Sequence, residues 1–125
     1  MFNVCPRCGR YAEEKAVDPA GPYAVCPHCG YAHPFRRSPL FVVTGASGAG
    51  KSTVSLPLAG TLPGCVVFET DILWCPELDT PDDDWARWRR LWVRLVKNVA
   101  QSGLASVLCG TFLPQGIEPL AERRF

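Results

Sequence analysis

The sequence lacks the long apolar run that a membrane-spanning helix requires. No stretch of its 125 residues approaches the roughly 20 consecutive apolar residues that such a helix needs. A secretory signal is also missing, because Cys5, Pro6, Arg7 and Cys8 stand where the apolar core of a signal would begin. We therefore expect a cytoplasmic protein without a membrane partner.

The chain also has little excess of charge of either sign. Thirteen lysines and arginines against twelve acids give a formal net charge of +1. A protein that works on nucleic acid usually carries a strongly basic footprint, so nucleic acid is a disfavoured partner, although a local basic face stays open. Internal repeats and low-complexity tracts are absent, and 47% hydrophobic with 20% charged residues is typical of a globular chain.

Cysteine, in contrast, is abundant, with seven copies. Four of them form two Cys-x-x-Cys pairs, Cys5 with Cys8 and Cys26 with Cys29, and seventeen residues separate Cys8 from Cys26. This spacing is typical of a zinc site, and four protein ligands would close it, as in structural zinc sites. We predict a zinc ribbon. Iron in a rubredoxin-like site stays an alternative, because sulfur ligands alone do not exclude it.

The remaining cysteines and the two histidines are not assigned to the metal. His28 and His33 lie beside the ligands, and with four cysteines available we expect them to face solvent or neighbour the ligands. Cys65 and Cys109 fit ordinary packing positions in or beside strands. The role of Cys75 stays open.

The chain divides near residue 36. We expect the zinc ribbon over residues 1–35, a proline-punctuated linker over 36–39, and a second domain over 40–125. Since a linker separates the two, replacing Cys26 should unfold the ribbon and leave the second domain largely unaffected.

After the linker, apolar runs and turn signals alternate in the order strand, helix, strand, helix, strand. The expected strands are residues 40–44, 65–69 and 105–109. The expected helices run from 50 to about 60, with a kink at Pro57, and from the N-cap Thr80 with Pro81 in the first turn to the C-cap Gly103. This order predicts an α/β fold with a parallel sheet. The residues expected to pack the second helix against the core are Trp85, Trp88, Leu91, Trp92, Leu95, Val96 and Val99.

The loop after the first of these strands matches the G-x-x-x-x-G-K-[ST] pattern of a P-loop for nucleoside triphosphate. Its glycines allow backbone N–H groups to turn inward around phosphate, and the helix start adds partial positive charge. Lys51 should reach the β- and γ-phosphates of ATP, Ser52 should bind Mg²⁺, and Thr53 is a weaker supporting candidate. The predicted nucleotide-binding residues are Gly45, Ala46, Ser47, Gly48, Ala49, Gly50, Lys51, Ser52 and Thr53.

Acidic residues stand at the carboxyl end of the second strand, where an open α/β sheet binds its ligand. Asp71 could accept the proton of an attacking hydroxyl or hold Mg²⁺ through water, so we name it with Lys51 as a candidate catalytic residue. It could instead cap the helix before Ile72. Glu69 is a weaker candidate. The basic residues of the long helix are expected to form a solvated face, from which one or two could contact an acceptor's phosphate: Arg87, Arg89, Arg90, Arg94 and Lys97.

From Phe41 onward the chain resembles the small P-loop kinases of the nucleoside and nucleotide kinase-like group, near the gluconate kinase and chloramphenicol phosphotransferase branches. The segments that carry the resemblance are VVTGASGAGKST, ETD, WARWRRLWVRLVKNVAQSG and VLCGTFLP. The whole chain is most similar to bacterial ATP-binding proteins that join a zinc ribbon to such a domain. The resemblance implies strand order 2-3-1-4-5, Asp71 as the acid that activates the acceptor, and Thr111 with Pro114 where the third strand opens into the acceptor pocket.

Two departures from the family bear on activity. The third strand ends in Cys109, Gly110 and Thr111, without the aspartate that many P-loop proteins use to hold Mg²⁺. The resemblance also implies two further strands and an arginine-bearing lid, so we expect an incomplete kinase-like domain with three strands and weak catalysis. Its first strand would be an exposed edge that invites oligomerisation or a completing segment.

The leading functional hypothesis is Mg²⁺-assisted phosphoryl transfer from ATP to a small hydroxylated or nucleotide-like acceptor. The alternative is a nucleotide-dependent switch or binding module, in which the zinc ribbon holds nucleic acid or a partner protein. A kinase should consume ATP when one class of small acceptor is added, whereas a switch should not.

Overall fold

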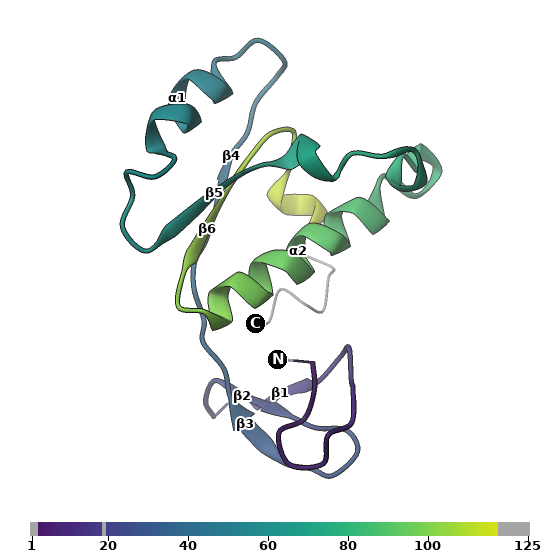
Figure 1. The fold of residues 1–125 in the computed structure, drawn as a ribbon. Coiled ribbons are helices and arrows are strands. Elements are labelled where there is room, and N and C mark those ends of the chain that lie inside the picture. Colours follow the sequence, from purple (N-terminus) through teal and green to yellow (C-terminus); the bar gives the residue numbers. More distant parts are fainter. Residues whose placement is uncertain (1–2, 19, 118–125) are drawn as a thin grey trace.

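The computed structural model describes residues 3–18 and 20–117, which form a small cysteine-bearing part and a larger α/β part. Figure 1 shows the two parts at opposite ends of the molecule, joined by the chain between β3 and β4. In the described part of the chain, no helix has both the length and the apolar character needed to cross a membrane.

The small part contains a three-stranded antiparallel sheet. Its strands are β1 (Ala16–Asp18), β2 (Tyr23–Val25) and β3 (Ala32–Pro34), in the order β1-β2-β3. Its apolar core is minimal: Ala24 and Phe35 are buried, and Val17 packs against them. So small an apolar core needs a further constraint to hold a part of this size together.

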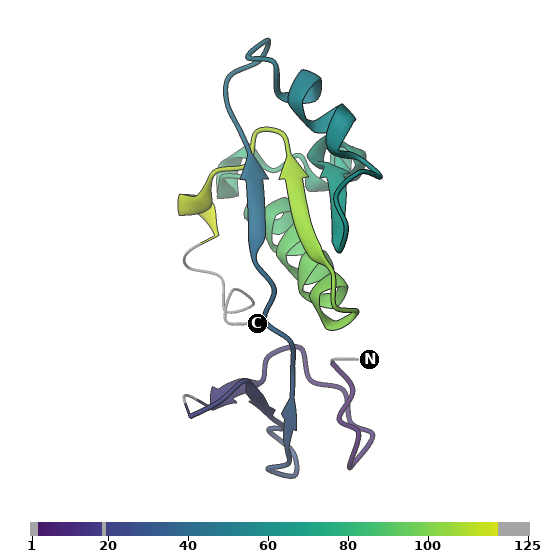
Figure 2. The same cartoon turned by 90° about the vertical axis from the view of Figure 1, so that its left-hand side faces the viewer.

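The larger part is built on a three-stranded parallel sheet, as the sequence predicts. The strands are β4 (Leu40–Val43), β5 (Cys65–Glu69) and β6 (Ala105–Cys109), in the order β4-β6-β5. Figure 2 shows them side by side, with α2 (Ala86–Gln101) behind. Among the described residues β4 has no partner on its other side.

The helix after β4 is shorter than expected. It is α1 (Lys51–Leu58), and it begins where Gly50 adopts a φ of 85°. Pro57 lies next to its last residue and cannot donate a backbone hydrogen bond there. The backbone N–H of Ala59 still bonds to the carbonyls of Ser55 and Leu56, which closes the last turn.

Helix α2 covers one face of the sheet and forms most of the core. Trp92, Leu108 and Phe112 are fully buried, and Phe68 lies 5.6 Å from Trp92 between ring centroids. Register explains the contact, because Val42 and Phe68 both pair with Leu108 and so point to the same face. The buried residues of this core are Trp88, Trp92, Val93, Val96, Leu108, Phe112 and Ile117.

The start of α2 and part of its expected core face are corrected by the structure. Thr80 and Pro81 begin a separate 3-10 helix, Pro81–Asp83, and α2 starts only at Ala86. Leu91, expected in the core, is 38% exposed, whereas Lys97, expected on a solvated face, is buried. The helix ends one residue earlier than predicted, with Ser102 as its C-cap, and Gly103 follows with a φ of 83° and an N–H that bonds to the carbonyl of Ala100.

The cysteine-bearing part contacts α2 directly. Arg94 forms a 2.7 Å ion pair with Glu13, and its guanidinium also donates to the Tyr11 hydroxyl at 3.3 Å. The side chain of Gln101 accepts from the backbone N–H of Arg36 and donates to its carbonyl, at 2.9 and 3.0 Å. The sequence argument placed only a linker between the two parts and missed these contacts.

Candidate functional site

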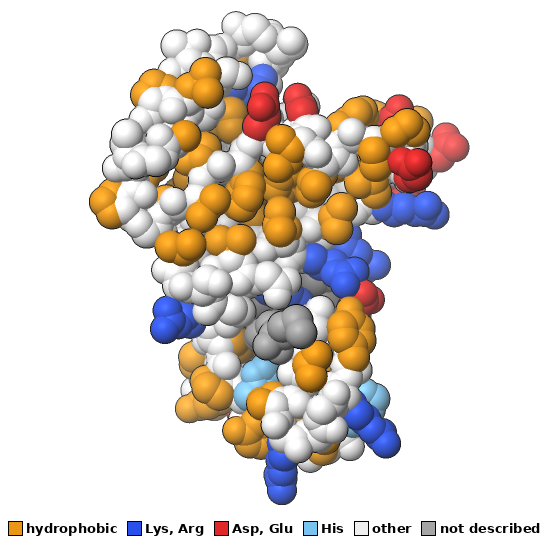
Figure 3. All heavy atoms as spheres, in the orientation of Figure 1, with side chains coloured by type: hydrophobic (Ala, Val, Ile, Leu, Met, Phe, Trp, Pro, Cys, Tyr) orange, Lys and Arg blue, Asp and Glu red, His pale blue; other side chains and the backbone are white. Residues whose placement is uncertain are grey.

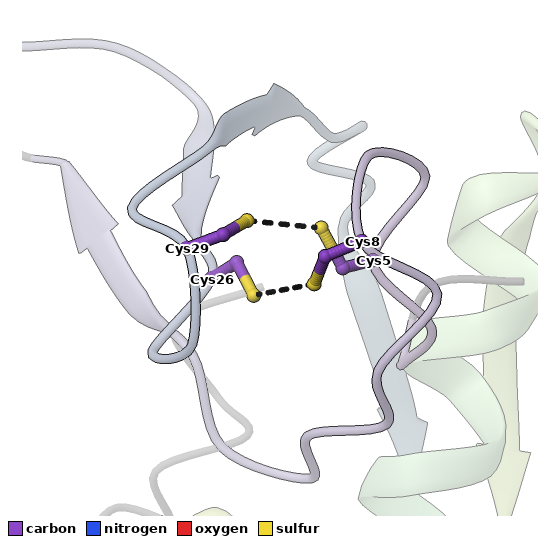
Figure 4. A group of neighbouring side chains, drawn as sticks. All are labelled: Cys5, Cys8, Cys26 and Cys29. Carbon is purple, nitrogen blue, oxygen red and sulfur yellow. Dashed lines mark hydrogen bonds between the residues drawn. The ribbon is translucent and has the colours of Figure 1, made fainter.

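The four predicted metal ligands come together at one point. The sulfur atoms of Cys5, Cys8, Cys26 and Cys29 all lie within 4.8 Å of one another, with Cys5 and Cys26 buried and the other two exposed. Figure 4 shows the two pairs facing each other, with 3.7 Å between Cys5 and Cys29 and 3.8 Å between Cys8 and Cys26. Four sulfurs around zinc at about 2.3 Å would stand about 3.8 Å apart at tetrahedral angles. The cluster could therefore hold a zinc ion.

The two Cys-x-x-Cys turns have the same backbone geometry. Gly9 and Gly30 each have a φ of 69°, and each donates its N–H to the carbonyl of the first cysteine of its pair at 2.9 Å. The sequence repeat thus becomes a structural repeat, because only glycine adopts this left-handed conformation at low cost. Two equivalent turns are what an S4 site needs.

Thiol acidity differs within the cluster. Burial raises the pKa of Cys5, but the backbone N–H groups of Cys8 and Arg7, with neighbouring thiols, outweigh burial and bring it to about 6. The pKa of Cys29 is raised to about 11: the Tyr31 N–H lowers it, while burial and the surrounding thiols raise it more. A lowered pKa favours the thiolate, which is the form of cysteine that binds metal ions.

Neither histidine belongs to the sulfur cluster. His28 is exposed and its Nε2 lies 3.3 Å from the Tyr11 carbonyl, in line with a solvent-facing position. His33 is buried rather than solvent-facing, with its Nε2 2.8 Å from the buried Lys15 Nζ. Burial, opposed by the negative charge of the four cysteines, lowers the pKa of Lys15.

The predicted phosphate loop is exposed, and Lys51 folds back over it. Its Nζ donates to the carbonyls of Gly45 at 2.9 Å and Ala46 at 2.8 Å. Gly48 and Gly50 have φ values of 76° and 85°, so the loop uses the backbone freedom that its sequence provides. The positive charge of Lys51 is thereby held at the loop by neutral acceptors.

The loop, the acids and Thr111 lie at one edge of the sheet. Val43 pairs with Cys109, and Cys109 pairs with Glu69, so the three strands end level with each other. Gly45, Asp71 and Thr111 each follow two residues after these paired positions. Gly110 joins the strand ends, because its N–H donates to the Val43 carbonyl at 3.0 Å and a Cβ there would collide with the Thr70 side chain.

Asp71 borders a pocket of about 940 Å³ at this edge. It lies in the first turn of the 3-10 helix Thr70–Leu73, whose N-cap residue is Glu69, and it is exposed. The geometry therefore gives no support to the helix-capping alternative. The pocket is lined by Asp71, Trp74, Trp85, Trp88, Arg89 and Thr111, among others.

Sequence reasoning missed the aromatic wall of this pocket. Trp85 and Trp88 were assigned to the core by helical periodicity, and Trp74 carried no pattern at all. Trp88 is buried as expected, but it and Trp85 also line the pocket. Arg89, expected on a solvated face, lines the pocket too, with only 16% of its side chain exposed. Clustering of three tryptophans within fifteen residues, from 74 to 88, was the available signal.

The sequence matches no protein-family model and no curated protein. Function is therefore inferred from the residues and their geometry.

Proposed function

We propose that the α/β part binds ATP with Mg²⁺ and transfers the γ-phosphoryl group to a hydroxyl of a small acceptor beside Asp71. The observation that carries the proposal is Lys51, whose ammonium group sits over the loop carbonyls of Gly45 and Ala46 at the start of α1. A cation held there by neutral groups is ready to exchange them for phosphate oxygens, which bind it more strongly.

The arrangement of the sheet supports the same proposal. Reading β4, β5 and β6 as first, second and third strands, the observed order is 2-3-1. This equals the beginning of the order 2-3-1-4-5 that the family resemblance implies. In open α/β sheets ligands bind at the carboxyl ends of the strands, which is where the loop, Asp71 and the pocket lie.

Oxygen donors suited to Mg²⁺ are present at this edge. Ser52 follows Lys51 in the first turn of α1, and both Glu69 and Asp71 are exposed carboxylates at the end of β5. Mg²⁺ prefers such ligands and retains several waters. Ser52 would bind the ion directly, and bound Mg²⁺ supplies charge neutralisation between the β- and γ-phosphates.

The transfer balances with ATP as the only co-reactant. The acceptor oxygen forms a bond to the γ-phosphorus while the bond from that phosphorus to the β–γ bridging oxygen breaks, and ADP leaves with the electron pair. The proton of the acceptor hydroxyl passes to the Asp71 carboxylate and then to solvent. Lys51 stabilises the charge that develops on the transferred group.

We further infer that the four cysteines bind one structural zinc ion. Support comes from the sulfur spacing of 3.7 and 3.8 Å across the two pairs and from the small apolar core beside them. Four protein sulfurs leave no open position for a catalytic water, so the ion would stabilise the fold rather than take part in phosphoryl transfer.

The test of nucleotide binding is Lys51→Ala, with calorimetric titration of a non-hydrolysable ATP analogue and Mg²⁺. Loss of the ammonium charge should weaken binding by about tenfold or more, because charge-assisted contacts to phosphate are lost. Arg87→Ala is the matched control: it removes one positive charge from an exposed side chain, 73% accessible, away from the loop. Equal affinity of both variants and the parent would overturn the proposal.

A nucleotide-dependent binding module is the second candidate, favoured by the contacts between the cysteine-bearing part and α2. Arg94 with Glu13 joins α2 to the cysteine-bearing part, and Gln101 with Arg36 joins it to the linker, so a shift of α2 on nucleotide binding would reach the cysteine-bearing part. ADP release that rises with a small acceptor distinguishes phosphoryl transfer from this alternative.

A further inference from the structure

The pocket beside Asp71 is large, and indole rings form much of its wall. Its volume of about 940 Å³ lies near the top of the roughly 300–1,000 Å³ range of small-molecule sites. Trp74, Trp85, Trp88 and Leu113 line it. A cavity of this size and lining matches a molecule with a ring system better than a short open-chain polyol.

The indoles form a connected cluster rather than separate surface residues. Ring centroids are 6.3 Å apart between Trp74 and Trp85, and 5.8 Å apart between Trp74 and Trp88. The Trp85 N–H donates to a carboxylate oxygen of Asp79 at 3.0 Å, which fixes that ring. Trp74 nevertheless keeps 47% of its surface exposed. A positioned and open indole is a stacking platform for a flat ligand.

Backbone strain is concentrated at the same wall. Asp84 and Trp85 have φ values of 53° and 54°, and they are the only non-glycine residues with positive φ in the described part of the chain. This left-handed conformation is uncommon for non-glycine residues, and strain of this kind gathers at ligand sites. Both residues line the pocket, where their conformation places an acid and an indole side by side.

The charges of the pocket disfavour an anionic ligand. Its charged lining residues are Asp71, Asp84 and Arg89, one positive group against two negative ones. Arg89 is already paired, because its Nη2 lies 3.0 Å from a carboxylate oxygen of Asp84. Figure 3 shows further acidic side chains gathered near the amino-terminal end of α2. A phosphate or carboxylate on the acceptor would thus meet two acids and a single cation that is already ion-paired, among the described lining residues.

Two wall residues retain hydrogen-bond donors without partners in the described structure. They are the indole N–H of Trp88 and the Nε–H of Arg89, both buried. An unpaired buried donor is costly, and an oxygen or ring nitrogen on the ligand would satisfy it after a small side-chain rotation. A ring that carries hydrogen-bond acceptors is therefore preferred.

We propose that the phosphate acceptor is an uncharged aromatic alcohol. Its flat ring stacks on Trp74, and its aliphatic hydroxyl lies beside Asp71. Sugar acids and nucleoside monophosphates are excluded, the former because they lack the ring and both because they are anionic. The role of the hydroxyl rests on the proposed phosphoryl transfer, whereas the ring site rests on the indoles and the charges alone.

The binding test uses calorimetry without ATP, on the full chain loaded with zinc. The probes are thymidine and benzyl alcohol as neutral aromatic alcohols, thymidine 5′-monophosphate as the anionic match to thymidine, and gluconate as the ringless acid. Thymidine should bind about tenfold or more tightly than its monophosphate, because the acids repel the added charge. The proposal is overturned if neither neutral probe binds, or if the monophosphate or gluconate binds as tightly.

Variants separate stacking from charge. Trp74→Ala should weaken thymidine binding about tenfold while Trp74→Phe retains most of it, because an aromatic face is the requirement. Ile72→Ala is the control, since Ile72 lies in the 3-10 helix that ends just before Trp74, is 63% exposed and is not among the described lining residues. Asp84→Asn should free Arg89 and improve binding of the monophosphate several-fold, whereas Asp82→Asn should not. Circular dichroism checks that each variant is folded, and unchanged ligand preference in both Trp74→Ala and Asp84→Asn would refute the assignment.

ADP release distinguishes failure of this inference from failure of phosphoryl transfer. If thymidine binds with the expected dependence on Trp74 but ATP and Mg²⁺ yield no ADP, the transfer fails and the aromatic site stands. If ADP is released with gluconate or a monophosphate and with neither neutral probe, the transfer stands and the acceptor class is wrong.

Discussion

At the scale of single residues, Asp71 illustrates what the sequence could and could not assign. Its place after a buried strand predicted a position at the ligand edge, and it does border the pocket there. Whether it would cap the following helix could not be decided from the sequence, because Asp suits both roles. The structure places Glu69, not Asp71, at the N-cap of the 3-10 helix, and Asp71 is exposed beside the pocket.

Replacing Asp71 by Asn should therefore separate binding from turnover. The amide keeps the size of the side chain but cannot accept the proton of the acceptor hydroxyl. We expect unchanged affinity for the ATP analogue and a fall in kcat of about 10²-fold or more, the usual contribution of a general base. Steady-state ADP release at saturating ATP and acceptor measures the effect.

Glu69→Gln serves as the control for Asp71→Asn. Glu69 is an exposed acid two residues earlier and does not line the pocket. A fall in kcat of similar size in both variants would indicate a contribution that the two acids share, such as binding of Mg²⁺, and not proton transfer to Asp71. An Asp71→Asn variant with the parent's kcat would remove Asp71 from the reaction.

At the scale of elements, the strands were predictable and the segment between residues 70 and 85 was not. Short β-branched runs ending at glycine or an acid identified β4, β5 and β6 to within a residue. Three consecutive 3-10 helices then occupy Thr70–Leu73, Pro76–Leu78 and Pro81–Asp83. Elements of three or four residues carry no periodicity, and their proline and acid signals are the same as those of an α-helix start.

The left-handed pair at Asp84 and Trp85 is the physical reason that α2 begins late. A helix cannot continue through two residues of positive φ, so Thr80 and Pro81 belong to an earlier turn. Asp83 accepts both from the Thr80 hydroxyl, at 2.6 Å, and from the Ala86 N–H, at 3.3 Å. Trp85, which has this conformation, packs its ring against Trp74. Such a tertiary contact is not visible in a local sequence pattern.

The close approach of Gly110, after β6, to Thr70, after β5, predicts an effect on stability. A Cβ at Gly110 would meet the Thr70 side chain, and Gly110 also has a φ of 155°. Gly110→Ala should lower the free energy of unfolding by about 1–3 kcal/mol through overpacking. Urea unfolding followed by tryptophan fluorescence measures the loss.

Two variants test the cause of that loss. Gly60 also has a positive φ, 76°, but a Cβ at Gly60 would have no atom within 4 Å. Gly60→Ala therefore measures the cost of an unfavourable backbone conformation without a collision. Thr70→Ala combined with Gly110→Ala should recover part of the stability, because the colliding hydroxyl and methyl groups are gone. The collision is refuted if Gly110→Ala costs no more than Gly60→Ala, or if the double variant gains nothing.

At the scale of the whole molecule, the two parts are linked by more than the chain between them. Arg94 contacts Glu13 and Tyr11, and the Nζ of the buried Lys97 lies 3.4 Å from the Asn3 side chain. Sequence alone could not reveal this, because charged residues at helical spacing are equally typical of a solvated face. The Arg94–Glu13 pair is partly exposed, 33% and 53%, so its own contribution is modest, under about 1 kcal/mol.

Metal removal should therefore affect both parts, although unequally. We expect about one zinc ion per chain by elemental analysis, bound through the four thiolates. A strong chelator should unfold the cysteine-bearing part, because metal binding supplies most of its folding free energy. Lys97 and Arg94 would then lose their contacts with the cysteine-bearing part. The Tm of the α/β part should fall by only a few degrees, as expected for a loss of about 1 kcal/mol.

Cys26→Ser should reproduce the chelator's effect, whereas Cys65→Ser, which changes a cysteine outside the cluster, should retain the metal. Calorimetric melting combined with hydrogen exchange distinguishes the two parts. Protection of backbone amides from exchange should vanish in β1, β2 and β3 and should fall on the side of α2 that contacts the cysteine-bearing part. A metal-free protein with undiminished protection in β1–β3 would show that the cysteines are not what holds that part together, and unchanged exchange in α2 would show that the contacts between the parts carry no free energy.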